Sequence, residues 1–510
     1  MRKKKAIVNI CFSLLLELVT VISGLIVPRL IIGTFGSEVN GLLGSITSFI
    51  GYITLLQTGV GSAIKAALYK PLADKNHEEL CIIVKTSNVF FRKIAVATMI
   101  YIGLLMLLFP LVVANEFGWI YTASLVGIIG ISTAAQYFFG ITYQMVLEAD
   151  QISYVYSAVQ IIATILNTFF VFIMIKNGYS IQVVKLISAM FFVARPIALS
   201  EYTKRMYKIM LNVPIDNSLI GQRWNAFAQG IAYFIHSKTD IFVLTLFSTF
   251  TDVSIYSVYT LVTTGLSSLI NSIDKAVRSA FGNIIACNEK ENLIRTFNAY
   301  NTLIHMLSTV CFATASITVF DFVNIYVDNI TDANYIQPVF GVLIITAEFM
   351  YCLRSPYNSI IYAAGKFKET RVSAGIEAGL NIVISCLLVS NLGLIGVAIG
   401  TLVAMIYRTV SFTHYLCGDV LEFTAVSQIK RYGVTFFVYF ISVICFSKIH
   451  VMSHGYIEWI IYATIIVALV SIITLIINLI LDKKNTISAL KMIGGNRLNW
   501  IFSGKCFNKK

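Results

Sequence analysis

The sequence predicts an all-α polytopic membrane protein with about fourteen transmembrane helices, and three observations support this fold class. First, 57% of the 510 residues are hydrophobic and only 12% are charged, whereas soluble proteins carry about 25% charged residues. Second, apolar runs recur along the whole chain between short polar breaks, and about 20 apolar residues are enough to cross a bilayer. Third, Lys and Arg gather in alternate connections, as the positive-inside rule requires.

Each apolar run is read as one span. The predicted spans lie at residues 7–33, 41–68, 86–114, 119–145, 154–175, 181–200, 225–248, 254–284, 297–322, 336–363, 373–390, 394–416, 432–448 and 457–481. The first run follows the basic residues 1–5 directly and shows no small-residue cleavage site. We therefore expect a retained first helix and not a signal peptide.

The distribution of positive charge predicts the orientation. With the N-terminus in the cytoplasm, the even-numbered connections and both tails are cytoplasmic, and they hold most of the Lys and Arg residues. The outer connections are all short, so we expect no extramembrane domain. The net charge of +13 is explained by topology and not by nucleic-acid binding.

An internal repeat appears at a constant offset of 214 residues. The matching positions are Glu38-Val39 with Asp252-Val253, Gly51 with Gly265, Asn167 with Asn381, and Asn177 with Asn391, while Arg195 and Arg408 differ by 213. Six helices per copy is an even number, so both copies share one orientation and are related by a pseudo-two-fold axis along the membrane normal, with a substrate site between them. We expect an N-terminal six-helix lobe at 1–210, a C-terminal six-helix lobe at 211–420, helices 13 and 14 at 421–482 and a basic cytoplasmic tail at 483–510.

The span at 225–248 carries three ionisable residues near its middle, where each charge costs roughly 2.5 to 3.5 kcal/mol. His236 and Asp240 lie on one polar stripe, and Lys238 lies on the other side of the helix. One interpretation places these charges on a hydrated lumen. The alternative is a structural lock in which each charge pairs with a neighbouring helix.

The first span has a similar pattern. A polar stripe runs through Glu17 to Pro28, and Arg29 follows the proline. Pro28 is expected to kink or weaken the helix, which suits a moving helix that lines a lumen. Close packing of small residues is the alternative, but it leaves Glu17 unexplained.

Further intramembrane charges lie in other spans. Asp274 and Arg278 are four residues apart and are expected to pair, Glu377 is expected to snorkel to the cytoplasmic face, and Arg354 lies deeper. The excess of positive charge suggests an anionic ligand. The candidates for cationic contacts to it are Arg29, Lys65, Lys238, Lys275, Arg278 and Arg354, where Lys65, Lys275 and Arg278 also fit ordinary positive-inside charges. The candidates for binding a coupling ion are Glu17, His236, Asp240 and Glu348.

Catalytic and metal-binding motifs are not found. The sequence shows no GxSxG, HExxH, P-loop or metal-spaced histidine cluster. We therefore predict no enzyme, no catalytic residue, no metal and no cofactor apart from possible coupling to H⁺ or Na⁺. The nine cysteines lack CxxC or ligand spacing, and no disulfide framework is expected.

Three stretches resemble the polysaccharide and oligosaccharidyl-lipid flippases (Wzx-like) of the multidrug/oligosaccharidyl-lipid/polysaccharide (MOP) exporter superfamily. They are residues 35–76 (with FGSEVNGL and LLQTGVGSAIKAALYKPLADKN), residues 236–256 (HSKTDIFVLTLFSTFTDVSIY) and residues 364–401 (AGKFKETRVSAGIEAGLNIVISCLLVSNLGLIGVAIGT). The resemblance covers most of the chain in the same order. It implies two six-helix lobes around a cationic central cavity, two further C-terminal helices and alternating access.

The resemblance also implies a substrate class. This is a polyprenyl-pyrophosphate-linked oligosaccharide repeat unit for a capsule, O-antigen or exopolysaccharide, moved from the inner to the outer leaflet of the bacterial inner (cytoplasmic) membrane. The implied partners are membrane lipids and the polymerase and glycosyltransferases of the same pathway. Two alternatives stay open: a cation-coupled multidrug antiporter of the same superfamily and a lipid II flippase. A polymerase or ligase is disfavoured because the chain has no large outer loop.

Overall fold

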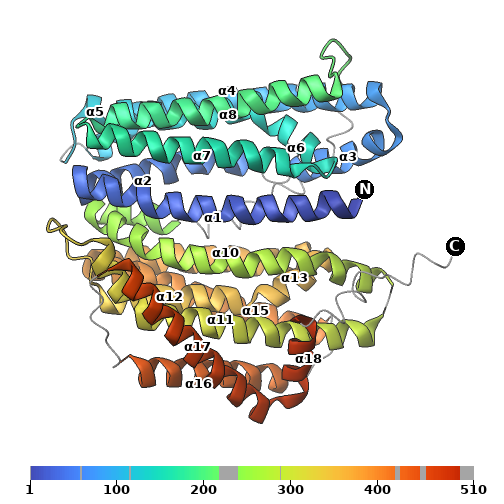
Figure 1. The fold of residues 1–510 in the computed structure, drawn as a ribbon, viewed down its shortest axis with the longest axis vertical. Coiled ribbons are helices and arrows are strands. Elements are labelled where there is room, and N and C mark those ends of the chain that lie inside the picture. The colour runs from blue at the N-terminus through green and yellow to red at the C-terminus, as the bar shows by residue number, and fades with distance from the viewer. Residues whose placement is uncertain are drawn as a thin grey trace. The chain divides into compact units, whose positions relative to one another are not determined.

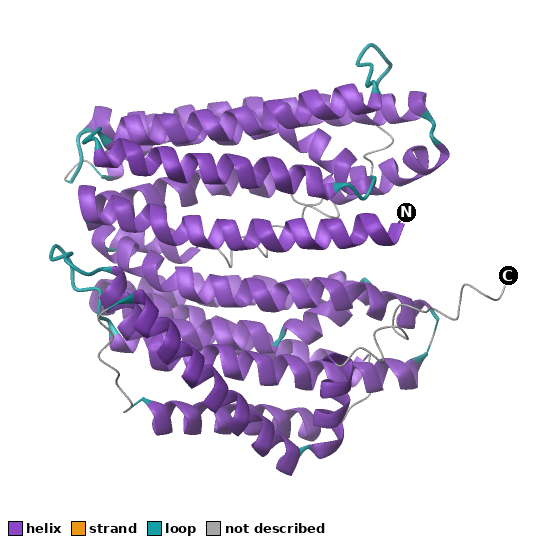
Figure 2. Cartoon of the chain, in the orientation of Figure 1, coloured by secondary structure: helices purple, strands orange, loops and turns teal. Residues whose placement is uncertain are grey.

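Every regular element of the described chain is a helix (Figure 2). The computed structural model of the protein describes residues 2–57, 60–113, 116–216, 239–287, 289–419, 425–447 and 455–493. Within these ranges, twelve helices are long and apolar enough to cross a membrane. The predicted all-α polytopic fold class is thus confirmed, and the protein is a multi-pass membrane protein.

The twelve membrane-length helices coincide with twelve of the fourteen predicted spans. The remaining two predictions have different outcomes. The span at 225–248 lies mostly outside the described residues, and its last part, 239–247, is helical. The span at 41–68 is not one continuous helix, as described below.

Packing divides the chain into two units, Met1–Ser254 and Ile255–Lys510. The predicted lobe boundary at 210 stays a prediction. In the first unit the elements are α1 Arg2–Phe35, α2 Ser37–Gly51, the 3₁₀-helix η1 Tyr52–Gln57, α3 Val60–Asp74, α4 His77–Val112, α5 Trp119–Ala135, the π-helix η2 Gln136–Gly140, α6 Ile141–Ala149, α7 Ser153–Lys176 and α8 Ile181–Tyr207 (Figure 1). Helix α1 packs along α7, α4 along α5, and α7 along α8.

The predicted helix at 41–68 is divided into α2, η1 and α3, so the prediction of one continuous span is wrong. The break begins at Gly51, where the helix tightens into the 3₁₀ turn of η1. The hydroxyl of Thr54 donates to the carbonyl oxygen of Gly51 at 2.7 Å. Such a local side-chain bond offers the backbone an alternative to the regular helix, and glycine tolerates the change of direction.

Helix α1 continues through Pro28, and the kink or weak point expected at this residue stays a prediction. A proline removes only one backbone donor, and neighbouring helices commonly hold such a transmembrane helix together. Here α7 provides the support, because the hydroxyls of Ser23 and Thr168 lie 2.7 Å apart in a hydrogen bond between α1 and α7.

The second unit begins within α10 Phe250–Ala286 and contains the longest helices. The elements that follow are α11 Lys290–Tyr326, α12 Pro338–Leu353, α13 Ser355–Ala364, α14 Phe367–Leu392, α15 Leu394–Asp419, α16 Ala425–Phe446, α17 Tyr456–Leu481 and α18 Lys483–Ile493. Its core is aromatic, with fully buried rings such as Tyr259, Phe312, Phe340 and Phe349. The first part of the predicted basic tail forms α18, which packs on α11 and α17.

Two membrane helices are interrupted at equivalent positions of the predicted repeat. In the first unit, the π-helical turn η2 separates α5 from α6 and ends at Gly140. In the second unit, Arg354 separates α12 from α13, and Pro356 follows in the first turn of α13. The helices after the two breaks, α6 and α13, begin at Ile141 and Ser355, which are 214 positions apart, so both breaks end at equivalent positions of the repeat. Breaks of this kind are frequent at functional sites.

Close backbone approaches fix helix pairs in each unit. A Cβ atom at Gly41 would lie 1.8 Å from the carbonyl oxygen of Phe250, and one at Gly400 would lie 2.2 Å from the hydroxyl of Ser385. Small residues let helices approach in this way, which is the usual basis of packing in membranes. In the second unit this brings α14 and α15 together along their length.

Six of the seven cysteines whose side chains the structure describes follow the prediction. Those at 11, 81, 311, 352, 386 and 445 are free thiols. Cys287 is disulfide-bonded, in the turn after α10. The expectation of no disulfide rested on the missing CxxC or ligand spacing and on cysteines placed in helices or cytoplasmic loops, and the bond at Cys287 contradicts it at this position.

Candidate functional site

A continuous chain of polar side chains crosses the first unit. Lys65 on α3 forms an ion pair with Glu148 on α6, with Nζ and Oε2 3.0 Å apart. Gln144 donates to the other carboxylate oxygen of Glu148 at 2.8 Å, and Gln136 in η2 donates to Gln144 at 3.4 Å. Arg195 on α8 closes the chain with a 3.3 Å bond to the side-chain oxygen of Gln136.

This chain makes the π-helical turn part of a polar network. Arg195 also lies over the ring of Phe192, 5.6 Å from its centroid, and its Nε is buried without a hydrogen-bond partner in the described chain. Sequence analysis selected Lys65 but not Glu148 or Gln136. A signal existed for Arg195, because it matches Arg408 in the repeat.

The N-terminal end of α1 is held by the turn between α6 and α7. Lys5 lies 3.6 Å from a carboxylate oxygen of Asp150. Asn9 donates to the carbonyl oxygen of Gln151 at 2.9 Å and accepts from the backbone amide of Tyr154 at 3.0 Å. The side chain of Asn9 thus satisfies both a donor and an acceptor of that turn, which fixes the position of α1.

Asp240 is buried, with 5% of its surface exposed. It lies on the helical stretch 239–247, which packs against α2 and η1 through the ring of Phe242. The centroid of this ring is 5.1 Å from that of Phe49 and 5.9 Å from that of Tyr52. Asp240 itself makes interactions within the protein, and the predicted residues His236 and Lys238 lie outside the described part of the chain.

The expected pair of Asp274 and Arg278 is confirmed, with 2.7 Å between Oδ2 and Nη2. Asp274 is buried and also accepts hydrogen bonds from the hydroxyls of Tyr300 and Ser359. The Arg278 side chain keeps 35% of its surface exposed, and its guanidinium lies 4.3 Å from the centroid of the Tyr362 ring. Asp274 is therefore an anchor, while Arg278 retains accessible positive charge.

The second unit contains a buried cluster of two arginines and one glutamate. Arg354 lies 2.6 Å from one oxygen of Glu377, and Nε of Arg408 lies 3.4 Å from the other. All three side chains are at most 11% exposed. Glu377 does not snorkel to the cytoplasmic face as expected, because the two guanidinium groups compensate its charge inside the protein.

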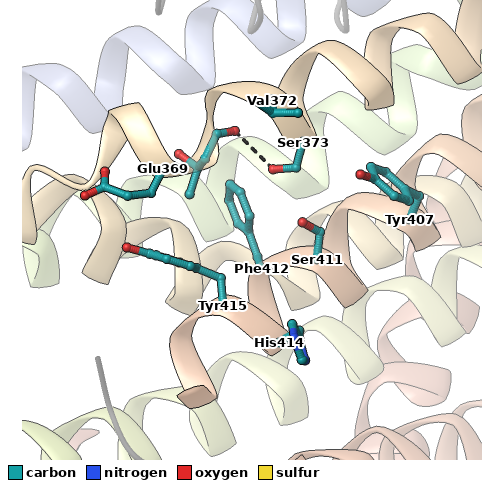
Figure 3. A pocket seen from close by; sticks show the side chains of 9 residues that line it. Glu369, Val372, Ser373, Tyr407, Ser411, Phe412, His414 and Tyr415 are labelled. Carbon is teal, nitrogen blue, oxygen red and sulfur yellow. Dashed lines mark hydrogen bonds between the residues drawn. The ribbon is translucent and has the colours of Figure 1, made fainter. Parts of the chain in front are cut away.

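A cavity of about 330 Å³ lies between the first turns of α14 and the last turns of α15. Its lining combines polar and aromatic side chains, labelled in Figure 3, and comprises Glu369, Thr370, Val372, Ser373, Tyr407, Ser411, Phe412, His414 and Tyr415. Arg408 supports one wall, because its Nη1 donates to the carbonyl oxygen of Thr370 at 3.1 Å and to the hydroxyl of Ser373 at 2.8 Å. Sequence analysis did not identify this cavity.

The remaining predicted site residues are not brought into one constellation. Glu17 is half-buried on α1 and has no ion-pair or hydrogen-bond partner within the described chain, whereas Arg29 and Glu348 are half-buried and have partners. Lys275 lies on α10, but its side chain is outside the described part. The roles assigned to these residues stay predictions.

Paired charges lie within or beside the membrane-length helices of both units. Charged side chains inside a membrane are expensive and are retained where they pair or face a pathway, and the chain offers them in both units. The long helices, interrupted at repeat-related positions, fit transporters built from two related halves.

The comparison with solved structures finds the same fold in a lipid II flippase and in multidrug transporters. The lipid II flippase MurJ in an inward closed conformation superposes with a TM-score of 0.67 and 16% identity, covering 91% of this chain and 98% of that protein. An inward-facing multidrug resistance MATE family transporter of the MOP superfamily superposes with a TM-score of 0.57 and 15% identity, covering 81% of this chain and 98% of that protein. The Vibrio cholerae MATE transporter VcmN in its bent form superposes with a TM-score of 0.52 and 13% identity, covering 83% of this chain and 99% of that protein. No protein-family model and no curated protein sequence matches this chain.

Proposed function

We propose that the protein is a flippase that moves a polyprenyl-pyrophosphate-linked oligosaccharide from the inner to the outer leaflet of a bacterial cytoplasmic membrane by alternating access. The observation that carries this proposal is the extent of the similarity to the lipid II flippase. That superposition covers 91% of the chain, and the MATE superposition covers 81%. The difference between these two coverages is a tenth of the chain, which is close to the length of the C-terminal helices α16 and α17.

The C-terminal pair is an integral part of the second unit. Arg431 on α16 lies 2.7 Å from Asp482 at the end of α17 and also donates to the hydroxyl of Thr302 on α11. His305 on α11 contacts Thr435 at 2.8 Å through Nδ1. Buried polar bonds hold α16 and α17 in place. We therefore favour a role for this pair in the transport machinery over its being an appended segment.

The intramembrane charge supports an anionic head group. Arg278 keeps accessible positive charge beside a buried acid that holds it in place, and Arg is suited to bidentate contacts with phosphate. Lys65, Arg29, Arg354 and the predicted cations Lys238 and Lys275 complete the proposed set. Glu17, His236, Asp240 and Glu348 are the proposed groups for coupling to H⁺ or Na⁺.

A multidrug antiporter is the second candidate, and the MATE similarities favour it. A cavity for organic cations needs an acidic lining, whereas the acids Glu148, Asp274 and Glu377 are all paired with Lys or Arg. This pairing supports the flippase over the antiporter.

Deletion of the gene in its own bacterium tests the proposal. The flippase predicts loss of a surface polysaccharide and accumulation of its lipid-linked repeat unit on the cytoplasmic side, with unchanged resistance to cationic drugs. Restored export by the wild-type gene is the control. Normal surface polymer together with increased sensitivity to organic cations would support the antiporter instead.

A further inference from the structure

We propose that the cavity between α14 and α15 binds a neutral, hydroxyl-rich head group, most simply a hexose of a membrane glycolipid. The cavity's volume of about 330 Å³ falls in the lower part of the range of roughly 300–1,000 Å³ that is typical of small-molecule sites. Its chemistry, its accessibility and its rigidity each point to this class of ligand.

The lining offers hydrogen bonds that the protein leaves unused. Among the described residues, Tyr407, Ser411 and His414 have no hydrogen-bond partner for their side chains, although all three belong to the cavity lining. Each can donate and accept. Three side chains of this kind, together with the carboxylate of Glu369, suit a ligand that carries several hydroxyl groups.

Aromatic rings supply the second feature of a sugar site. Tyr407, Phe412 and Tyr415 enter the cavity from one helix, α15 (Figure 3). Rings offer large, rigid surfaces against which the apolar face of a pyranose can pack. The combination of ring faces and hydroxyl partners is less suited to a purely hydrocarbon ligand.

Charge argues against the two other ligand classes. No Lys or Arg belongs to the described lining, and two cations beside it, Lys366 and Arg408, are already paired with Glu369 and Glu377, so the lining itself presents a phosphate with a carboxylate. An organic cation is disfavoured too, because Glu369 lies 3.5 Å from Lys366 and Arg408 lies over the ring of Phe412, 4.1 Å from its centroid. With anions and organic cations disfavoured, a neutral ligand fits the cavity best.

One wall of the cavity is held by hydrogen bonds, and one lining residue is largely exposed. Arg408 bonds two lining residues and is itself held by the carboxylate of Glu377, so the wall is fixed before a ligand arrives. Val372, which lines the cavity, is 67% exposed on the apolar outside of α14. A lipid-attached sugar could therefore enter while its chain stays in the bilayer. Only the identity of the natural ligand, a lipid-linked oligosaccharide, rests on the proposed flippase function.

Binding can be measured on the full-length protein in nanodiscs of phosphatidylcholine and phosphatidylglycerol. The probe is n-octyl β-D-glucopyranoside below its micellar concentration, followed by saturation-transfer NMR, with n-octanol, tetraphenylphosphonium and inorganic phosphate as comparison ligands. We expect saturable binding through the sugar protons that none of the three comparison ligands displaces. Displacement by octanol would show that only the alkyl chain binds, and displacement by either ion would contradict the assignment to a neutral ligand.

Variants locate the binding site. Ser411→Trp fills the cavity and should abolish saturable binding, whereas Val410→Trp, on the next residue and 61% exposed outside the lining, should leave it unchanged. Tyr407→Phe keeps the ring and should weaken binding about three- to tenfold, the effect of one hydrogen bond. Equal binding by wild type, Ser411→Trp and Tyr407→Phe would overturn the proposal. This assay involves no transport. A failure of sugar binding would therefore leave the proposed flippase function intact, and a failure of transport would leave the proposed sugar site intact.

Discussion

Asn40 donates a hydrogen bond from Nδ2 to the hydroxyl of Ser254 at 2.8 Å, and the two residues are 214 positions apart in the chain. This is the offset of the internal repeat, so equivalent positions of the two copies contact each other directly. The same interface contains the 2.7 Å bond from Thr245 to Ser45 and the close approach of Gly41 to Phe250. Contacts between α2 and residues 239–254 are therefore central to the stability of the first unit.

The first prediction concerns Gly41. Gly41→Ala should destabilise the protein by about 1–3 kcal/mol, because the added methyl group meets a backbone carbonyl oxygen that cannot turn away. Thermal unfolding in detergent, followed by size-exclusion chromatography, measures the change. Gly33→Ala is the matched control, since a Cβ there meets no atom within 4 Å. Equal melting temperatures for the two variants would contradict the close approach.

Glu377 gives a prediction on buried charge. Glu377→Leu leaves Arg354 and Arg408 without their shared carboxylate and should cost about 3–5 kcal/mol. Replacing both arginines by Met in the same variant should restore much of this stability. Glu201→Gln, in the exposed pair with Arg205, should cost less than about 1 kcal/mol. A stable Glu377→Leu single variant would show that the cluster is hydrated.

A comparison of Arg278 with Arg205 tests whether Arg278 acts in transport. Arg278 and Arg205 each pair with an acid four residues earlier at 2.7 Å. Arg278 lies in the intramembrane set proposed to meet the head group, and Arg205 lies at the exposed end of α8. Arg278→Ala should lower the rate of flipping at least about tenfold, while Arg205→Ala should not change it. Equal rates would remove Arg278 from the substrate path.

Glu116, in the connection between α4 and α5, predicts a pH effect. Burial, together with the nearby charge of Glu38, raises its pKa above the ordinary value of 4.5. Because the folded-state pKa is the higher one, the penalty for ionised Glu116 is absent below pH 4.5 and is complete above the raised pKa. Stability should therefore fall as pH rises through this window, and Glu116→Gln should reduce that dependence in melting experiments. An unchanged dependence would contradict the raised pKa.

Helix type and position were largely predictable because hydropathy directly reports which segments avoid water. Twelve spans agree with the structure for this reason. The division of residues 41–68 was not predictable, since the same apolar run is compatible with an α-helix and with the 3₁₀ turn at Tyr52. Pro356 gave a signal for the break at Arg354, whereas nothing in the apolar run marked the π-helical turn at Gln136.

Ion-pair partners between helices were the part of the site that sequence could not supply. Asp274 and Arg278 pair within one helix, so their spacing was sufficient. Lys65 pairs with Glu148 across 83 positions, and Arg354 pairs with Glu377 across 23. Such partners depend on which helices pack together, and a single sequence carries no such information. Accordingly, Glu148 was missed and Glu377 was placed at the membrane surface.

The most direct test of the central claim measures movement of a lipid-linked oligosaccharide across a bilayer. The full-length protein is reconstituted into phospholipid vesicles with a polyprenyl-pyrophosphate oligosaccharide labelled on the sugar with a fluorophore, and an impermeant quencher is added outside. The flippase predicts that the fraction protected in the inner leaflet disappears over time in vesicles with protein and persists in vesicles without it. Persistent protection with the protein present, in vesicles that transport a fluorescent organic cation, would contradict the account.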